Sequence, residues 1–212
     1  SLRRPVKKIG PYISISRQFG SGGMAISKRV AEKLGWQHFD REIIEAIANR
    51  THARGELVAK FDEHIQNELQ TYLYNLFTKQ MLNNTQYLHH LTQVLLGIAQ
   101  FGEAVIVGRG ANFILPPEAG LRVRIIAPIA FRQQQLVQVC GYSEKQAARK
   151  IAQQDEEQRA FFQHHFRCQP DDPCAYDVIL NTSSINLNTA VEVILQLAQA
   201  KLQISVKPDQ TL

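Results

Sequence analysis

The sequence lacks several features that define whole classes of protein. No apolar run approaches the roughly 18 to 20 residues of a membrane-spanning helix, so we expect no membrane span. The first residues, SLRRPVKKIGPY, are basic but contain neither an apolar stretch nor a small-residue cleavage site, which argues against a secretory signal. Three cysteines, Cys140, Cys168 and Cys174, are an odd count that does not suit a disulfide framework. These absences predict a cytoplasmic protein.

Charge and missing motifs narrow the function further. Lys and Arg number 24 against 19 Asp and Glu, and the resulting charge of +5 suits a small anionic ligand as well as nucleic acid. Residues 1–11 are predicted to form a flexible basic N-terminus, and without a nucleic-acid-binding motif we consider nucleic acid an unlikely partner. No G-x-S-x-G element supports a serine hydrolase.

The remaining pattern is that of one α/β domain over residues 12–205, followed by a frayed tail at 206–212. Short runs rich in Ile and Val, each bounded by turn-forming residues, predict strands at 12–16, 104–108, 122–127 and 177–181, with a weaker candidate at 37–40. Helical periodicity separates them, most clearly at 26–34, 88–98 and 187–202. Strands alternating with helices predict a parallel sheet with helices on both faces.

One region interrupts this alternation. Residues 41–101 are helical throughout, which predicts an insertion in the α/β core. Two apolar stripes, Leu69 to Phe77 and Leu88 to Ile98, could pair with each other or with a second chain. The insertion therefore serves either closure over a ligand or contacts in a homodimer.

The most informative segment is Arg17 to Gly23 (RQFGSGG), between the first strand and the first helix. Its glycines, with the free amides and dipole of a helix start, favour anion binding at Gly20, Ser21, Gly22 and Gly23, with the Ser21 hydroxyl as a further donor. Compared with G-x-x-x-x-G-K-[ST], however, Arg17 replaces the first glycine, Gly23 the lysine and Met24 the hydroxyl residue. On its residues alone the segment suits a phosphate loop and a plain turn equally.

Several segments together resemble the cytidylate kinase-like branch of the P-loop nucleoside monophosphate kinases. These are ISISRQFGSGG with the following helix up to Asp40, AVIVGRGANFIL, LRVRIIAP and YDVILNTSSINLNTAVEVI, in the same order as in that family. The resemblance implies a five-stranded parallel sheet of the P-loop NTPase type, a helical monophosphate-binding insertion and a basic lid. It also implies transfer of the γ-phosphate of ATP to a CMP- or dCMP-like acceptor, with Mg²⁺.

Arginines at strand ends are the candidates for holding the phosphates, because phosphoryl transfer requires cations over the transferred group. Arg17 and the arginines of a predicted lid would replace the charge of the missing lysine, which makes Arg17, Arg109 and Arg159 the catalytic candidates. Arg109 follows the 104–108 strand between two glycines, where it could bind an acceptor phosphate or lie in an ordinary surface turn. Asn112, in the same segment, is a further substrate-binding candidate. Gly110 stands where cytidylate kinases carry Asp.

The residues that open the insertion are also candidates. Asp40 matches an acidic position of the family and could organise the acceptor or metal, but it could equally cap the helix that starts at Arg41. Arg41 is included among the substrate-binding candidates. The arginine that cytidylate kinases carry a few residues later is replaced here by Glu45 and Ala46.

A lid is predicted at residues 145–175. Arg149, Lys150, Asp155 and Arg159 resemble the basic lid of the family, and Asp155 could orient Arg159 through an ion pair four residues along the helix. The same charges could instead form a solvated helix face.

Two further hypotheses remain open at this stage. His164, His165, Cys168 and Cys174 lie close together, but their spacing is unlike that of zinc sites, and we assign no metal to them. Loss of the loop lysine also leaves open a catalytically weak or inactive nucleotide-binding module, or a kinase of a different small acceptor.

Overall fold

The computed structural model describes residues 9–49, 71, 72, 74 and 85–205. Its elements, in chain order, are β1 (Tyr12–Arg17), α1 (Gly23–Leu34), β2 (Gln37–Phe39), α2 (Arg41–Asn49), α5 (Gln86–Phe101), β3 (Ala104–Val107), α6 (Ala111–Ile114), β4 (Gly120–Ile126), α7 (Ile129–Cys140), α8 (Glu144–Phe166), a 3₁₀ turn (Pro173–Ala175), β5 (Val178–Asn181) and α9 (Leu187–Leu202).

Five parallel strands form one sheet in the order β2-β3-β1-β4-β5. β1 is central, and the apolar side chains of Ile13 and Ile15 are almost completely buried in it. The prediction of a five-stranded parallel sheet, including the weak strand that became β2, is confirmed. Because β1 pairs with β3 on one side and β4 on the other, the loops after these strands meet at the carboxyl edge, where open α/β sheets bind ligands.

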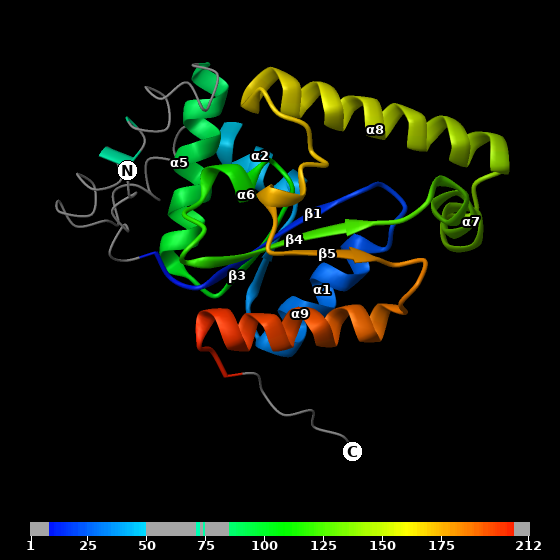
Figure 1. The fold of residues 1–212 in the computed structure, drawn as a ribbon. Coiled ribbons are helices and arrows are strands. Elements are labelled where there is room, and N and C mark those ends of the chain that lie inside the picture. Colours follow the sequence, from blue (N-terminus) through cyan, green and yellow to red (C-terminus); the bar gives the residue numbers. More distant parts are fainter. Residues whose placement is uncertain (1–8, 50–70, 73, 75–84, 206–212) are drawn as a thin grey trace.

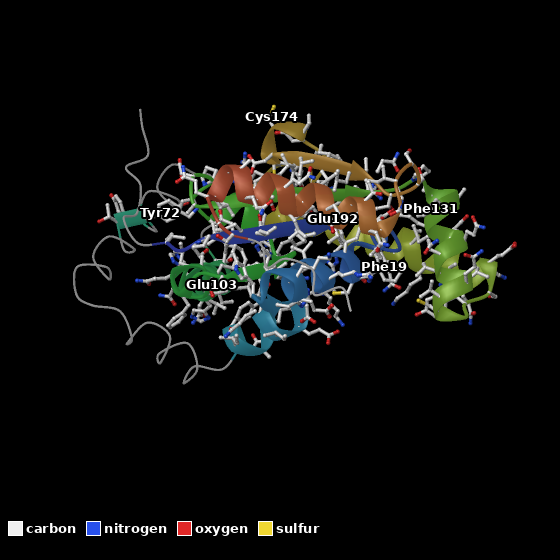
Figure 2. The ribbon with its side chains drawn as sticks, turned by 90° about the horizontal axis from the view of Figure 1, so that it is seen from below. Phe19, Tyr72, Glu103, Phe131, Cys174 and Glu192 are labelled. Carbon is white, nitrogen blue, oxygen red and sulfur yellow. The ribbon has the colours of Figure 1, made fainter. Side chains whose placement is uncertain are left out.

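Helices cover both faces of the sheet (Figure 1). On one face, the apolar stripe of α1 packs against that of α9, with Val30 and Ile194 both completely buried. On the other face, α5 and the end of α8 share a core that includes Leu91, Leu95 and Phe162. Figure 2 shows the α1 and α9 side from below and labels Glu192 of α9, which forms an ion pair with Lys33 of α1 at 3.1 Å. The regular helical periodicities of the sequence are therefore explained by burial.

Helices α7 and α8 form a hairpin that follows β4 (Figure 1). α7 ends at Gly141, which adopts a left-handed conformation (φ 69°), and Ser143 caps α8 through a reciprocal pair of hydrogen bonds with Gln146. Apolar contacts involving Leu136, Ala147 and Ile151 hold the two helices together. This hairpin places the side chains of α8 over the carboxyl end of β1.

Some predictions fall on residues that the structure does not describe. These are the basic N-terminus up to residue 8, most of the Leu69 to Phe77 stripe, residues 50–70 and 75–84 of the insertion, and the tail after residue 205. The homodimer contact through the insertion stays a prediction for the same reason. Among the described helices, none has the length and apolar character that crossing a membrane requires.

Candidate functional site

The loop after β1 forms an open cradle of backbone amides at the start of α1. Gly20 (φ 82°) and Gly22 (φ 78°) adopt left-handed conformations, and no side chain caps the helix that follows Gly22. The amides of Gly20, Gly22, Gly23 and Met24 are among those of this loop that have no acceptor among the described residues. Unsatisfied amides at the positive end of a helix dipole are suited to an anion.

Ser21 does not contribute its hydroxyl to this cradle. Its side chain is buried (1% exposed) and donates a hydrogen bond to the Gln18 carbonyl at 2.7 Å. The loop uses that hydroxyl to satisfy its own backbone in this structure, and the expectation that Ser21 donates to a phosphate stays a prediction. The carbonyl of Ser21 in turn accepts a hydrogen bond from Thr182 after β5 at 2.8 Å. Ser21 thus holds the shape of the loop.

Arg17 and Gly23 fit against each other in a way that explains the missing lysine. A Cβ built on Gly23 would lie 2.7 Å from the Cβ and 3.2 Å from the Cγ of Arg17, so the arginine stem fills the space where a side chain at residue 23 would begin. The guanidinium reaches toward the end of β3, since a Cβ on Gly108 would lie 3.4 Å from Nη1 of Arg17. The cation of this loop is thus attached to the strand instead of to the helix.

Three arginines approach one another at this edge of the sheet. Burial, together with the positive charges of Arg41 and Arg109, lowers the pKa of Arg17, and the carboxylate of Asp40 acts in the opposite direction. Like charges held this close favour an anionic ligand, because such a ligand relieves their mutual repulsion. A cluster of guanidinium groups is also well suited to phosphate geometry.

A large cavity of about 1070 Å³ joins the loop to these arginines. Its volume is at the upper end of the range of roughly 300 to 1,000 Å³ typical of small-molecule sites. Its wall also includes parts of α7 and a long stretch of α8. The charged, histidine and glycine residues on this wall are Arg17, Gly20, Gly22, Gly23, Arg41, Gly108, Arg109, Glu157, His164 and His165.

Arg109 is held from two sides at the end of β3. It adopts a positive φ of 52°, and its guanidinium lies over the ring of Phe161 of α8, 4.5 Å from the centroid. Its Nη1 is 3.1 Å from Oε1 of Glu45, and its side chain is 11% exposed. The structure therefore places Arg109 on the cavity wall, as the sequence predicted, with its orientation fixed by an aromatic face.

The structure also explains the glycine that follows Arg109. Gly110 adopts φ 68°, and a Cβ there would lie 2.2 Å from Cζ of Phe166 at the end of α8. No side chain fits between this loop and the helix. The carboxylate that cytidylate kinases carry here is thus excluded by the packing of Phe166.

Asp40 and Arg41 lie at the start of α2. Oδ1 of Asp40 accepts a hydrogen bond from the Ile43 amide at 3.0 Å, so Asp40 caps the helix, as one of its two interpretations predicted. Arg41 lies on the cavity wall, and its Nε is 3.6 Å from Glu45. Asn112 is buried on α6, and neither it nor Asp40 is part of the cavity wall. Of these residues, the structure places Arg41 best to contact a ligand.

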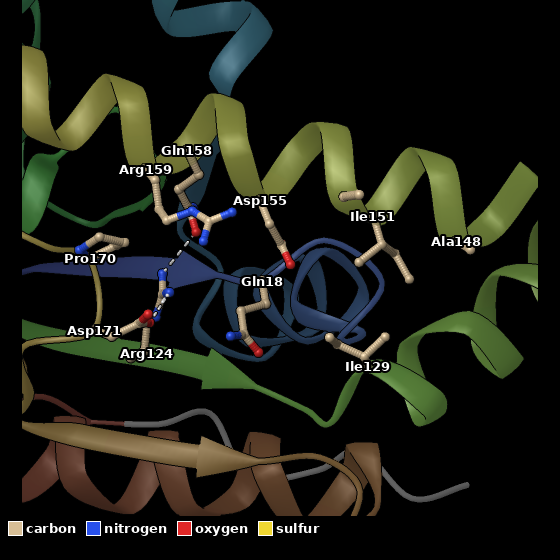
Figure 3. Close-up of a pocket in the computed structure, with 11 residues that line it drawn as sticks. Gln18, Arg124, Ile129, Ala148, Ile151, Asp155, Gln158, Arg159, Pro170 and Asp171 are labelled. Carbon is tan, nitrogen blue, oxygen red and sulfur yellow. Dashed lines mark hydrogen bonds and ion pairs between the residues drawn. The ribbon is translucent and has the colours of Figure 1, made fainter.

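The predicted lid residues do not gather over the phosphate loop. Arg159 lines a smaller cavity of about 320 Å³ between α8 and β4 (Figure 3), which adjoins the large cavity at Gln18 and Gln158, and it forms an exposed ion pair with Glu156 at 2.9 Å. Neither Arg149 nor Lys150 is part of the wall of the large cavity. Asp155 does not orient Arg159, because its carboxylate binds another arginine.

That arginine is Arg132 of α7, which the sequence analysis missed. It donates two hydrogen bonds to Asp155, both at 2.9 Å, and one to the Phe19 carbonyl of the phosphate loop at 3.2 Å. Its side chain is 3% exposed. The available signal was that Arg132 is the single charged residue in an otherwise neutral helix. It ties the α7–α8 hairpin to the phosphate loop.

A second buried arginine, Arg124 of β4, lies in the smaller cavity. It donates to the Ser16 hydroxyl at 2.7 Å and to Asp171 at 2.8 Å, and it approaches Gln158 of α8 (Figure 3). Gln158 also donates to the Arg17 carbonyl at 3.1 Å. These contacts fix α8 against the end of β1 just before the phosphate loop.

The described residues do not form a metal centre. They contain no group of three or more His, Cys, Asp or Glu side chains that could hold a metal ion. Burial raises the pKa of the Cys168 thiol to about 11, which disfavours the thiolate that zinc requires. Met24, at the position of the usual Ser or Thr, provides no oxygen ligand for Mg²⁺. The residues present therefore do not fit a dedicated protein-built magnesium site.

The two histidines considered with Cys168 instead line the large cavity. Burial, and then the positive charges of His164 and Arg109, lower the pKa of His165. Its ring lies 4.7 Å from that of Phe161, between centroids. The lowered pKa favours the neutral form of His165, and its ring packs against that of Phe161 at a tilt of 59°.

Comparison with known proteins agrees with this geometry. The chain matches the cytidylate kinase-like family over residues 12–184. It is 25% identical to the cytidylate kinase of Pyrococcus horikoshii over 171 residues, which cover 81% of this chain and 79% of that protein. An uncharacterized protein from Eubacterium ventriosum has a similar structure, with a TM-score of 0.61, 19% identity, and coverage of 91% of this chain and 99% of the other. The shikimate kinase from Bacteroides thetaiotaomicron gives a TM-score of 0.46 at 19% identity, covering 91% and 98%. The chain belongs to the cytidylate kinase-like family.

Proposed function

We propose that this protein is a phosphotransferase that moves the γ-phosphate of ATP to a CMP- or dCMP-like acceptor. The observation that carries the proposal is a large cavity whose wall combines the free loop amides with Arg17, Arg41 and Arg109. Family membership and the likeness to a cytidylate kinase support the reaction type and the class of acceptor.

The loop would bind the donor. Its free amides at Gly20, Gly22 and Gly23 would contact the β- and γ-phosphates, and Arg17 would supply the positive charge beside them. Mg²⁺ would arrive with ATP and be held mainly by the phosphates, as is common for this ion. It would neutralise charge on the transferred group.

Arg109 would bind the acceptor phosphate, with Arg41 beside it. Both follow elements that end at the same edge of the sheet as the loop, so the two phosphates would face each other across the cavity. Helix α8 forms part of the wall and would limit the access of water to the reacting groups. Catalysis would consist of positioning and electrostatic stabilisation, which is what phosphoryl transfer requires of a protein.

The test is an activity panel with matched variants. Purified protein is incubated with ATP, Mg²⁺ and a set of ribo- and deoxyribonucleoside monophosphates, and ADP is measured. We expect ADP formation that depends on CMP or dCMP. Arg109→Ala should weaken monophosphate binding, Arg17→Ala should weaken ATP binding, and the control Arg29→Ala should change neither, because Arg29 is exposed on α1 and bonds Asn188. Titrations in which neither Arg17→Ala nor Arg109→Ala has an effect would refute both assignments.

A nucleotide-binding module with little or no catalysis is the second candidate. It is favoured by Gly23 and Met24, which provide neither the lysine nor the hydroxyl that normally act on the transferred group. Loss of each such group could cost about 3 to 4 kcal/mol of transition-state stabilisation. ATP binding without ADP formation would support this candidate. ATP binding with ADP formed only in the presence of a non-nucleotide acceptor would support a kinase of another small molecule.

A further inference from the structure

Glu45 of α2 forms ion pairs with Arg109 and Arg41, the arginines proposed to bind the acceptor. Its Oε1 is 3.1 Å from Nη1 of Arg109 and 3.6 Å from Nε of Arg41. Both arginines line the cavity, whereas Glu45 does not belong to its wall. A carboxylate of the chain itself therefore bridges the two cations from behind.

This contact places a negative charge beside the guanidinium that a phosphate would bind. One face of the guanidinium is covered by Phe161, and Nε is buried without a partner among the described residues. Its Nη1 forms an ion pair with Glu45, so the carboxylate partly neutralises the charge that would attract a phosphate. Two parallel hydrogen bonds from one guanidinium to a phosphate are the strongest form of this interaction. Glu45 thus competes with a ligand for Arg109.

Arg41 offers Glu45 a second position. The two residues are four apart on one helix, a spacing at which side chains of opposite charge meet. If Glu45 leaves Arg109, its carboxylate can stay paired with Arg41 and does not become an isolated charge. After the exchange, Glu45 is paired with Arg41 and Arg109 with the phosphate, so neither charge is left without a partner. This is a condition for a counter-ion that a ligand can displace.

We propose that Glu45 is an internal competitor of the acceptor phosphate, released from Arg109 when the acceptor binds, and that it sets the affinity for anionic acceptors. This inference rests on the proposed role of Arg109 as the acceptor-binding residue. The ion pair between Glu45 and Arg41 contributes little to folding, because these side chains are 32% and 44% exposed. Arg109 is only 11% exposed, but it lines the open cavity, where water can solvate its charge once Glu45 is replaced. Substitution of Glu45 should therefore change binding more than stability.

The experiment measures CMP, dCMP and cytidine binding by calorimetry, with the full chain, at about 0.15 M salt, where charges more than about 8 Å apart are screened. Glu45→Gln and Glu45→Ala are compared with Glu42→Gln, which removes the same charge from an exposed position on α2. We expect Glu45→Gln and Glu45→Ala to lower the Kd for CMP and dCMP by about two- to fivefold, the effect of one partly exposed ion pair. Cytidine, which has no phosphate, should show no such change.

Each outcome separates this inference from the proposed function. The inference is supported if both Glu45 variants bind CMP more tightly while Glu42→Gln leaves the Kd for CMP unchanged. It is also supported if the Glu45 variants bind CMP and the unsubstituted chain does not. Unchanged or weaker CMP binding overturns it, and weaker binding would mean that Glu45 contacts the acceptor directly. If Arg109→Ala abolishes CMP binding while the Glu45 variants leave it unchanged, this inference fails and the acceptor role of Arg109 stands. If none of the proteins binds CMP or dCMP, both fail.

Discussion

The contact between Arg17 and Gly23 makes a quantitative prediction about the phosphate loop. A methyl group at residue 23 would lie 2.7 Å from Cβ of Arg17, too close for two carbon atoms, and Cβ cannot move without the strand. Overpacking of this kind destabilises by about 1 to 3 kcal/mol. Gly23→Ala should lower the free energy of unfolding by that amount.

The variant at residue 17 decides whether this contact is the cause. Arg17→Ala keeps the Cβ and should leave the effect of Gly23→Ala nearly unchanged. Arg17→Gly removes the Cβ, and in that background Gly23→Ala should be neutral or stabilising by about 0.5 to 1 kcal/mol, because alanine replaces glycine in a helix. The free energies come from urea unfolding, and the coupling comes from a double-mutant cycle.

The same pair of positions tests the placement of the charge. Arg17→Gly should weaken ATP binding, and adding Gly23→Lys to it should restore ATP binding, because the cation then extends from the helix start. Gly23→Lys alone should be destabilised like Gly23→Ala. The reasoning is refuted if Gly23→Ala is neutral in the unsubstituted protein, or if Arg17→Gly does not relieve its effect.

Two further predictions concern ion pairs. Asp155→Asn leaves the buried guanidinium of Arg132 without its carboxylate, and we expect the free energy of unfolding in urea to fall by about 2 to 3 kcal/mol, less than for a fully buried pair because Asp155 is partly exposed. The control Glu156→Gln, at an exposed ion pair, should change the free energy of unfolding by less than about 0.5 kcal/mol. Equal effects of the two substitutions would contradict this prediction. Burial disfavours the charged form of Asp177, but hydrogen bonds from Arg122 and Lys201 outweigh this effect and lower the pKa of Asp177. The charged carboxylate therefore stabilises the fold fully above the unfolded pKa of about 3.9, and this stabilisation is lost as the pH falls through the folded pKa. In thermal unfolding, the difference between Asp177→Asn and the unsubstituted protein should be present at neutral pH and decrease as the pH falls below the unfolded pKa of about 3.9; a constant difference would refute it.

The sequence predicted those parts of the fold that depend on local pattern. The strands are short apolar runs between turn-forming residues, and the ends of α1 at Gly23 and Gly35 follow from the glycines. The position of Arg109 at the carboxyl edge of the sheet also followed, because residues after parallel strands meet at one edge of a sheet.

Pairings between distant helices could not be predicted in this way. Spacing along α8 suggested that Asp155 pairs with Arg159, but the buried guanidinium of Arg132, contributed by another helix, binds that carboxylate instead. A local pair exposed to water contributes little, whereas a buried arginine needs a partner. Which face of α8 meets α7 depends on the packing of the hairpin, and single-sequence periodicity does not define it.

The reason for a glycine at residue 110 also could not be predicted from the sequence, because it depends on a contact with a distant residue. The sequence showed that a carboxylate was missing after Arg109, but the ring that excludes it belongs to Phe166, far along the chain. Likewise, Glu45 was noted as a replacement for an arginine, and its contact with Arg109 became apparent only when α2 was placed beside β3.

The placement of α8 has a consequence for how two ligands would influence each other. Within a few turns this helix carries Gln158, which bonds the carbonyl of Arg17, and Phe161, which supports the guanidinium of Arg109. A rigid-body shift of α8 would move both contacts together, so a shift that strengthens binding of one nucleotide would also change the affinity for the other. Thermodynamic reciprocity then requires the donor to alter acceptor affinity by the same factor as the acceptor alters donor affinity. Cooperative binding of the two substrates would then be a consequence of the contacts that α8 makes with both binding regions.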